Sequence, residues 1–268
     1  MPLTRALLLG LLQGATEFLP ISSSGHLVLI PYFAGWAPPG LSFTVMVHWG
    51  TALAVAGYFW RDWADLLQGL GVAVRDRRLT DPRARLLVAL LLGTVPGAVV
   101  GWAGEDFFEG LFAHPAAAAA FLLATAGMLF VGERLAHRRR GLETLSWADA
   151  VVIGLAQAAA ILPGISRSGA TIVAGMALGL RREPAARFSF LLATPIIWGA
   201  GIFQVLDLAQ AGDLAAQYPS LLMGFVAAFL SGLAAIHFLL RYLRRRPLYP
   251  FALYCLLLGV AGLTYALL

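Results

Sequence analysis

Three kinds of reactive side chain stand together in one short stretch of an otherwise apolar chain: a carboxylate, hydroxyls and an imidazole. They belong to Glu17, Ser22, Ser23, Ser24 and His26. Such groups are costly in hydrocarbon, so they occur there when they face a polar cavity or a partner. A serine beside a carboxylate or an imidazole is a combination that nucleophilic and general-base catalysis uses. This stretch is therefore the first candidate for a site.

A second copy of the stretch lies 144 residues further along the chain. Segment 154–169 repeats segment 10–25 without a gap, and eight of the sixteen positions are identical. Glu17 corresponds to Ile161, and Ser23 corresponds to Arg167. One copy therefore carries an acid and the other a permanent cation, which indicates a duplicated element whose halves have divided the chemistry.

Both copies place hydroxyls after a proline-containing break, at Pro20 and at Pro163–Gly164, where a second half-helix would begin. Free backbone amides and the positive end of the helix dipole suit an anion there, especially phosphate. Arg167 adds a fork of donors that matches phosphate oxygens. The predicted phosphate ligands are Ser22, Ser24, Gly25, Ser166, Arg167, Ser168 and Thr171. The Glu17 carboxylate beside them could act as a general base or bind a divalent cation.

Each of these residues also has a structural interpretation. Residues 22–24 could cap a helix at the break, and Glu17 could form a buried ion pair with Arg167 that holds the two copies together. His26 could be a core histidine with its hydrogen bonds satisfied.

Three further polar residues lie inside apolar stretches. Gln13 is four residues from Glu17 and shares its helix face, and Gln13 and its counterpart Gln157 could instead join helices by hydrogen bonds. His48 is interpreted as structural or supporting, and is the better functional candidate among the histidines outside the repeat.

Composition indicates a polytopic membrane protein. Of 268 residues, 60% are hydrophobic and only 12% are charged, with mean hydropathy +0.80, and a soluble domain of this size would need more polar surface. All 19 basic residues are arginine, and 17 of them lie in segments 61–85, 134–140, 181–187 and 241–246. Short basic segments between apolar runs are typical of cytoplasmic loops, so the positive charge does not indicate nucleic acid. The single Cys255 offers neither a disulfide nor a cysteine metal site.

Six stretches are predicted to be ordinary membrane spans, each near the roughly 20 residues that a bilayer requires. They are residues 43–60, 86–103, 116–133, 188–206, 219–240 and 247–268. The basic loops 61–85 and 241–246 are expected inside. The loops 104–115 and 207–218, which contain no arginine, are expected outside.

The two repeated stretches are predicted to be re-entrant hairpins. Segment 148–180 has arginines at both ends, so a broken helix pair that returns to the side it entered keeps both clusters in the cytoplasm. Segment 34–42 carries no charge, so the first hairpin should enter from the outside. The predicted fold is an all-α polytopic membrane protein of one domain. It has two inverted-topology repeats, about 1–133 and 148–268, each with a hairpin and three spans.

The two motifs resemble those of the undecaprenyl-diphosphate phosphatase family of the bacitracin-resistance type. A Glu or Gln followed four residues later by Glu matches Gln13 and Glu17, and the motif continues through residue 26. The second motif, Pro-Gly-x-Ser-Arg-Ser-Gly-Ala-Thr, matches residues 163–171 at every position. By position, the resemblance assigns catalysis to Glu17, Ser23, His26 and Arg167, with Gln13, Ser166, Ser168 and Thr171 around them.

The resemblance implies hydrolysis of undecaprenyl diphosphate to undecaprenyl phosphate and inorganic phosphate, which recycles the lipid carrier of cell-wall synthesis and gives bacitracin tolerance. It implies the bacterial cytoplasmic membrane, a site open to the outer, periplasmic face, and dependence on Mg²⁺ or Ca²⁺. Gln13 stands where many members have Glu, so a metal would rely on Glu17 and substrate oxygens. The expected partners are the substrate, membrane lipid and a second copy in a homodimer, without nucleic acid.

The expected reaction is phosphoryl transfer, in which Ser23 attacks phosphorus or positions a water, and Glu17 or His26 accepts the proton. The competing function is transport of a lipid phosphate, because inverted repeats with broken helices around an anion site also build transporters.

Overall fold

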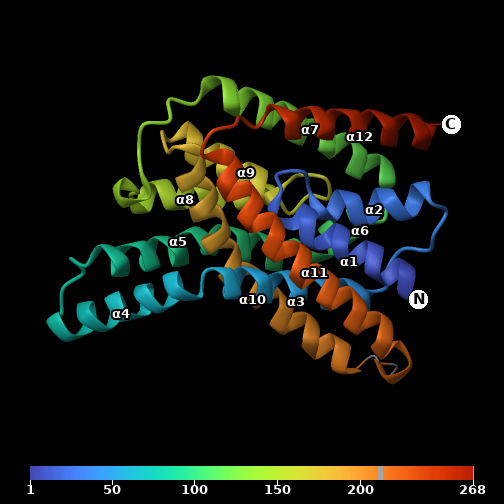
Figure 1. The fold of residues 1–268 in the computed structure, drawn as a ribbon, viewed down its shortest axis with the longest axis horizontal. Helices are drawn as coiled ribbons and strands as arrows, with labels where there is room; N and C mark the ends of the chain where they lie inside the picture. The colour runs from blue at the N-terminus through green and yellow to red at the C-terminus, as the bar shows by residue number, and fades with distance from the viewer. Residues whose placement is uncertain (211–213, 268) are drawn as a thin grey trace.

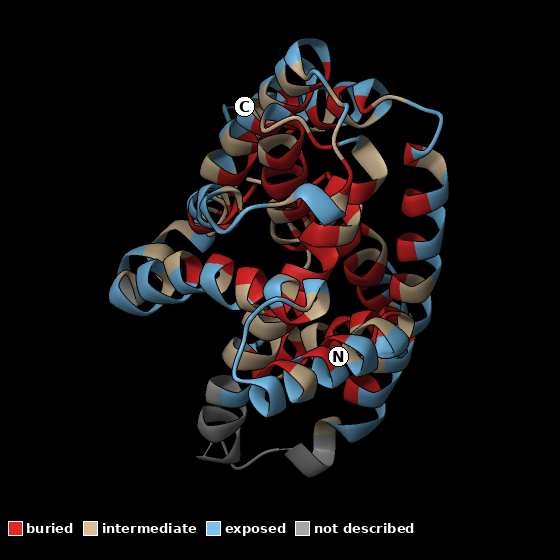
Figure 2. Ribbon diagram, turned by 90° about the vertical axis from the view of Figure 1, so that its left-hand side faces the viewer, coloured by how far each residue is buried: buried red, intermediate tan, exposed pale blue. Residues whose placement is uncertain are grey.

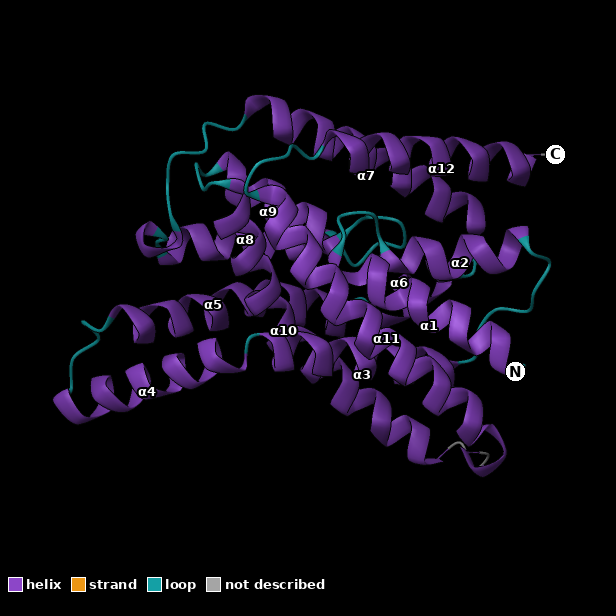
Figure 3. Cartoon of the chain, viewed as in Figure 1, coloured by secondary structure: helices purple, strands orange, loops and turns teal. Residues whose placement is uncertain are grey.

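The computed structural model describes residues 1–210 and 214–267, without the side chains of 105, 106, 109, 200, 203–210 and 214–216. The described residues form helices joined by loops, with no strand among them (Figures 1 and 3). The helices are α1 Leu3–Phe18, α2 Ser23–Phe33, α3 Leu41–Tyr58, α4 Trp60–Asp76, α5 Pro82–Ala103, α6 Glu105–Phe112, α7 Pro115–Leu135, α8 Trp147–Ala159, α9 Arg167–Ala177, α10 Arg182–Gln210, α11 Leu214–Leu243 and α12 Tyr249–Leu267.

Helices cover all six predicted spans, as α3, α5, α7, α10, α11 and α12. Five helical stretches are long and apolar enough to cross a membrane: α3, α5, α7, α12 and Gln217–Leu243 within α11. The end of the fourth predicted span and most of the predicted outer loop 207–218 lie outside the residues whose side chains are described. The chain is a polytopic helical membrane protein.

The two predicted breaks separate two pairs of short helices. Residues 19–22 lie between α1 and α2, and residues 160–166 lie between α8 and α9. Proline cannot continue a helix without losing a backbone hydrogen bond, and Gly164 takes φ of 98°, which favours glycine. With 11 residues each, α2 and α9 are about 17 Å long, roughly half of a hydrocarbon core of about 30 Å.

The two ends of each pair lie together. The backbone N–H groups of Arg139 and Arg140, before α8, donate to the carbonyl of Gly179, after α9, at 2.9 and 2.8 Å. The Arg5 guanidinium, at the start of α1, lies 4.9 Å from the centre of the Trp36 ring, just after α2. Each pair is therefore a hairpin: the α1–α2 hairpin and the α8–α9 hairpin.

The first helix of each hairpin packs against a long helix from the other half of the chain. α1 lies along α11, and α8 lies along α5. A Cβ at Gly10 would meet the Gly224 carbonyl at 2.4 Å, and a Cβ at Gly154 would meet the Gly93 carbonyl at 2.2 Å. These approaches admit only glycine. The buried residues gather where the helices cross, and the outer faces are exposed (Figure 2).

Two helices occupy segments that were predicted to be loops. Residues 60–76 of the basic segment form α4, which buries Leu66, Gly69 and Ala73 and lies against α5. Residues 105–112 of the predicted outer loop form α6. The prediction was wrong for 61–85 because the charge count hid an amphipathic pattern, in which apolar positions recur every three to four residues.

A buried carboxylate gathers the arginine-rich ends of three helices. Glu133, near the end of α7, is 2% exposed and accepts hydrogen bonds from Arg138 and Arg182. It also accepts from the backbone N–H of Leu248, before α12, at 3.1 Å. A buried carboxylate is stable when it is paired in this way, so these basic ends lie at one end of the molecule.

Candidate active site

The tips of the two hairpins meet in the middle of the molecule, where equivalent serines cap equivalent helices. Ser22 Oγ accepts from the backbone N–H of Gly25 at 3.2 Å, at the start of α2. Ser166 Oγ accepts from the backbone N–H of Gly169 at 3.1 Å, at the start of α9. The capping interpretation is thus confirmed for Ser22, and Ser166 caps α9 in the same way; both hydroxyls satisfy backbone donors that the helix leaves free.

A second pair of equivalent serines ties each tip to the other hairpin. The backbone N–H of Gly164 donates to Ser24 Oγ at 3.3 Å. Ser168 Oγ donates to the carbonyl of Leu19 at 3.1 Å. Each hairpin therefore holds the loop of its counterpart, and the two breaks form one rigid unit.

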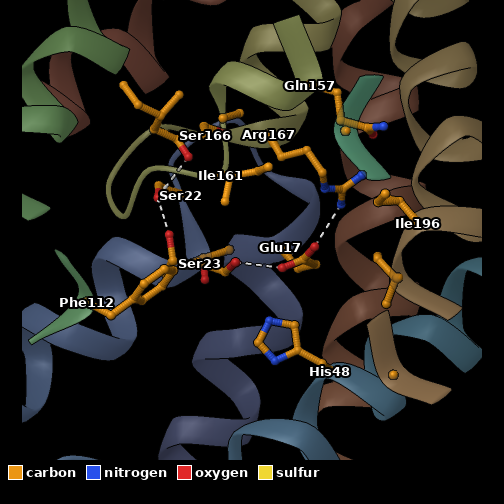
Figure 4. Close-up of a pocket in the computed structure, with 17 residues that line it drawn as sticks. Glu17, Ser22, Ser23, His48, Phe112, Gln157, Ile161, Ser166, Arg167 and Ile196 are labelled. Atoms are coloured by element: carbon orange, nitrogen blue, oxygen red, sulfur yellow. Dashed lines mark hydrogen bonds and ion pairs between the residues drawn. The ribbon is translucent and has the colours of Figure 1, made fainter. Parts of the chain in front are cut away.

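The third pair, Ser23 and Arg167, converges on a single carboxylate. Ser23 Oγ donates to Glu17 Oε2 at 2.6 Å, and Arg167 Nη2 donates to Glu17 Oε1 at 2.7 Å (Figure 4). These two residues are the first of α2 and of α9. A hydroxyl against a carboxylate that a third group orients is the arrangement of an activated nucleophile and its base.

Gln13 supports this carboxylate from one turn earlier on α1. Its Nε2 donates to Glu17 Oε2 at 3.1 Å. Its Oε1 is buried and meets no hydrogen-bond partner among the described residues. Gln13 thus holds Glu17 and keeps one unused acceptor beside it.

Glu17, Ser23 and Arg167 line a cavity of about 320 Å³. Of the other predicted site residues, the cavity wall includes Ser22, Ser24, Ser166 and His48. The remainder of the wall is largely apolar or small, and sequence reasoning did not select it as a site: Thr16, Gly97, Phe112, Gln157, Ala160, Ile161, Ile165, Ile196, Ile197 and Gly201. The cavity wall thus combines the charged Glu17–Arg167 pair with apolar side chains around it.

His26, predicted to be catalytic, does not line the cavity. Its ring is fully buried, with Nδ1 2.6 Å from the carbonyl oxygen of Ser22 and Nε2 2.7 Å from the hydroxyl of Tyr254. A carbonyl only accepts, so Nδ1 carries the proton and Nε2 accepts from the tyrosine. Both nitrogens are occupied, and the geometry makes His26 a support for the tip.

That support is needed because Ser22 has an unfavourable backbone conformation. Its φ is 68° and its ψ is 99°, in a region that costs a residue other than glycine about 1–3 kcal/mol. The His26 hydrogen bond holds the Ser22 carbonyl in place. This conformation directs the next residue, Ser23, toward Glu17.

His48 on α3 reaches the cavity that His26 does not. Its Nδ1 lies 2.8 Å from the carbonyl of Thr44, which fixes the proton on Nδ1 and leaves Nε2 as an acceptor. In Figure 4 its ring lies beside Glu17 and points into the cavity. An imidazole in this position can exchange protons with groups bound there.

Two other predicted phosphate ligands are used within the protein. Thr171 Oγ1 bonds the Arg167 carbonyl at 2.9 Å and Ser189 Oγ at 2.6 Å, and it is buried away from the cavity. A Cβ at Gly25 would lie 3.2 Å from Gly164 Cα, so this glycine permits close contact of the two tips. Both residues support the backbone of the site without lining the cavity.

The described residues contain no group of three His, Cys, Asp or Glu side chains that could hold a metal ion. Glu17 is a single carboxylate already bonded by Arg167 and Ser23. Hard cations nevertheless bind through one or two carboxylates together with substrate phosphates. The Glu17 carboxylate, which lines the cavity, fits that mode for a cation that arrives with its substrate, whereas Gln13 is fully buried and does not line the cavity.

Comparison with known proteins gives one family over nearly the whole chain. The family model described as "Bacitracin resistance protein BacA" matches residues 6–261. Proteins described as undecaprenyl-diphosphatase are similar from end to end. That of Pelotomaculum thermopropionicum is 44% identical over 266 residues, covering 99% of this chain and 97% of the relative. That of Syntrophotalea carbinolica is 45% identical over 268 residues (100% and 99%), and that of Rubrobacter xylanophilus is 46% identical over 273 residues (99% and 98%).

Proposed function

Because this chain belongs to the bacitracin resistance protein BacA family, we propose that the meeting point of its two hairpins hydrolyses undecaprenyl diphosphate to undecaprenyl phosphate and inorganic phosphate. The observation that carries the proposal is the continuous chain of hydrogen bonds Ser23–Glu17–Arg167 on the cavity wall. The reaction recycles the lipid carrier for cell-wall synthesis and gives tolerance of bacitracin.

In the first step, Ser23 Oγ attacks the terminal phosphorus and its proton passes to Glu17, which lies 2.6 Å away. The bond between that phosphorus and the bridging oxygen breaks, so undecaprenyl phosphate leaves and the terminal phosphoryl group remains on Ser23. Arg167 meets the charge of the phosphoryl oxygens through Nη1, which has no partner in the described protein. Phosphoryl transfer depends mainly on this kind of positioning and charge stabilisation.

A divalent cation, Mg²⁺ or Ca²⁺, would bind the diphosphate together with the Glu17 carboxylate. When bound, it would neutralise part of the charge on the diphosphate oxygens. The protein provides one carboxylate for it, so the cation belongs to the enzyme–substrate complex more than to the free protein.

The polyprenyl chain would leave the cavity past apolar side chains that line it. These include Phe112, Ile161, Ile196 and Ile197. Beyond them, lipid-facing grooves between helices accept a hydrocarbon without a closed pocket, because lipid tails are as apolar as the helices.

The short hydrogen bond between Ser23 and Glu17 favours hydrolysis over transport as the main activity. Moving a lipid phosphate across a membrane needs complementary charge but no nucleophile beside a base. Ser23 donates its hydroxyl hydrogen to Glu17, whereas the other serines at the two tips cap helices or join the two hairpins by hydrogen bonds.

Phosphate release from undecaprenyl diphosphate in detergent, measured with Mg²⁺, Ca²⁺ or EDTA, tests the function. Ser23→Ala and Glu17→Gln should each lose release while the folded protein elutes as a single species. Cation-dependent release that both variants retain would contradict the site, and no release by folded wild-type protein would contradict the function.

For the arrangement in the membrane, we propose two inverted units, about 1–133 and 148–268, each with one re-entrant hairpin. Three observations support this arrangement. The two ends of each hairpin lie together, and α2 and α9 are short. The first helix of each hairpin packs on a helix from the other half of the chain, α1 on α11 and α8 on α5. Cysteines introduced at Gly35 and at Arg139 in a Cys255→Ala background should react with an impermeant thiol reagent from opposite sides. Labelling from one side would refute it.

We also propose that the cavity opens toward the outer, periplasmic face of the bacterial cytoplasmic membrane, because arginine-rich ends are typical of the cytoplasmic side. A homodimer is likewise proposed, and the mass of the protein in the detergent micelle tests it: a single chain of 28.5 kDa would refute a stable dimer.

A further inference from the structure

Gln157 lines the cavity with an amide that the protein leaves unused. Its side chain comes from α8 and the residue is 3% exposed. Both its Oε1 and its Nε2 are buried without a hydrogen-bond partner among the described residues. Leaving two buried polar atoms unpaired destabilises a protein, because each has lost its hydrogen bonds to water without gaining another. An interhelical hydrogen bond, the structural interpretation of this residue, is not formed.

The Gln157 side chain lies between helix α5 and the cavity that it lines. Gly97 on α5 faces the amide, and a Cβ there would lie 3.3 Å from Gln157 Nε2. Arg167 lines the same cavity, and its Nη1 is a buried donor without a partner among the described residues. Two donors and one acceptor, held by two different helices, therefore remain free on one cavity wall.

These free atoms define what would bind between them. Gln157 Oε1 requires a hydrogen-bond donor, which a fully ionised phosphate cannot supply, whereas Nε2 and Arg167 Nη1 require acceptors. A water molecule next to a phosphoryl group meets both demands, because the water donates to Oε1 and the phosphoryl oxygens accept from the nitrogens.

Gln157 also lies on the side of the cavity where a second reactant would enter. In the view of Figure 4, Ser23 and Gln157 lie on opposite sides of the Glu17–Arg167 pair. Displacement at phosphorus proceeds in line, so the group that attacks phosphoserine must come from the side opposite to Ser23 Oγ. That side becomes free when undecaprenyl phosphate departs.

We propose that Gln157 positions the water that hydrolyses the phosphoryl group on Ser23, the second step of the reaction proposed above. The water oxygen bonds to phosphorus and the bond from phosphorus to Ser23 Oγ breaks. Glu17 returns to Ser23 Oγ the proton that it took in the first step. Both hydrogens of the water remain on the departing inorganic phosphate, so the protein is restored.

The repeat provides an internal comparison for this role. Gln13 holds the equivalent position in the first copy but donates to Glu17 at 3.1 Å. Gln13 is therefore hydrogen-bonded to the base of the first step. Gln157 has no such partner, because Ile161 stands four residues after it, at the position where the first copy has Glu17. A glutamine from the first half thus serves the first step, and the equivalent glutamine from the second half serves the second step.

The test is the amount of phosphate bound covalently to protein during turnover. Undecaprenyl diphosphate labelled in its terminal phosphate is mixed with Mg²⁺ and enzyme and quenched in acid, and labelled protein and free phosphate are counted. Gln157→Met keeps the length of the side chain and removes both hydrogen-bonding groups. We expect roughly 10- to 100-fold lower steady-state turnover, with label accumulating toward one per protein.

Matched variants separate this role from loss of packing. Gly97→Ala should accumulate label as well, because its methyl group crowds Gln157, whereas Gly57→Ala, with no described atom within 4 Å of its Cβ, should behave as wild type. Gln13→Met should slow release without accumulating label. The double variant Ser23→Ala/Gln157→Met should carry none.

The outcomes distinguish the two proposals. Lower turnover in Gln157→Met without accumulated label, in an enzyme whose wild type shows a transient labelled species, refutes the role of Gln157 alone. Absence of labelled protein from every variant and from the rapidly quenched wild type refutes Ser23 as the nucleophile. Unchanged turnover in Gln157→Met also refutes the role of Gln157.

Discussion

Replacing Arg167 by lysine should separate the two functions of its guanidinium. Nη2 holds Glu17 Oε1 at 2.7 Å, and Nη1 is buried without a partner in the described protein. Lysine keeps the charge but is a single point donor, so it cannot span both positions as the planar fork does. We expect Arg167→Lys to keep the ion pair and lose the bond to the phosphoryl group.

The size of the loss follows from that one bond. A hydrogen bond to a charged group contributes about 1.5–3 kcal/mol, so kcat/KM should fall roughly 10- to 150-fold. The thermal midpoint should change little. Arg167→Ala should differ, because Glu17 is 7% exposed and removing one partner of a buried pair costs about 3–5 kcal/mol.

Phosphate release and thermal unfolding in one detergent provide both numbers for each variant. Glu17→Gln/Arg167→Ala serves as the control, because removing both charges should recover stability without recovering activity. Arg167→Lys with kcat/KM within about two-fold of wild type would refute the fork argument. A large fall in its midpoint would show that the residue is needed mainly for folding.

Three further predictions address the support of the site. Tyr254→Phe removes the donor to His26 Nε2 and should lower turnover several-fold without moving the pH–rate profile; a displaced limb would mean that His26 titrates in catalysis. Gly154→Ala should lower the thermal midpoint by the equivalent of about 1–3 kcal/mol, because its Cβ would meet the Gly93 carbonyl at 2.2 Å. Gly127→Ala, with no described atom near it, is its control, and equal midpoints would show that the α5–α8 contact is loose. EDTA should stop phosphate release yet leave the midpoint nearly unchanged, and a midpoint that falls with EDTA would indicate a resident ion.

The helix breaks and the convergence of the repeats could be predicted from sequence because they depend on local rules. Pro20 and Pro163–Gly164 stand where the helices break, next to the serines that begin the following helices, and Ser22 and Ser166 each precede a glycine by three residues. The gap-free repeat matched Ser23 with Arg167, and these two residues meet at Glu17.

The direction of individual side chains could not be predicted in this way. Ser23 and His26 are three residues apart, about 60° around a helix, so spacing alone puts both near one face. The structure separates them because His26 pairs with Tyr254 on α12, 228 residues away, and because Ser22 takes a positive φ. No local pattern encodes either fact.

The cavity wall was missed for a similar reason. Phe112 belongs to a short helix in a segment that was predicted to be an outer loop, and Gln157 was interpreted as a link between helices. The sequence signal for Gln157 was that it repeats Gln13 although the acid that Gln13 accompanies is absent. Ile161 stands at the position of Glu17 in the second copy. Only the structure shows that its amide is left unpaired.

The bond between Glu17 and Arg167 joins residues 150 positions apart, which sets an order on biosynthesis. At about 5–20 residues per second, the ribosome adds the arginine roughly 8–30 s after the glutamate. During that interval the first hairpin holds a carboxylate with no cation to meet it, in a setting where charge is costly. The N-terminal hairpin should therefore stay at the insertion machinery or near water until the second arrives, and the site is complete only after the second hairpin, beyond the middle of the chain, has been inserted.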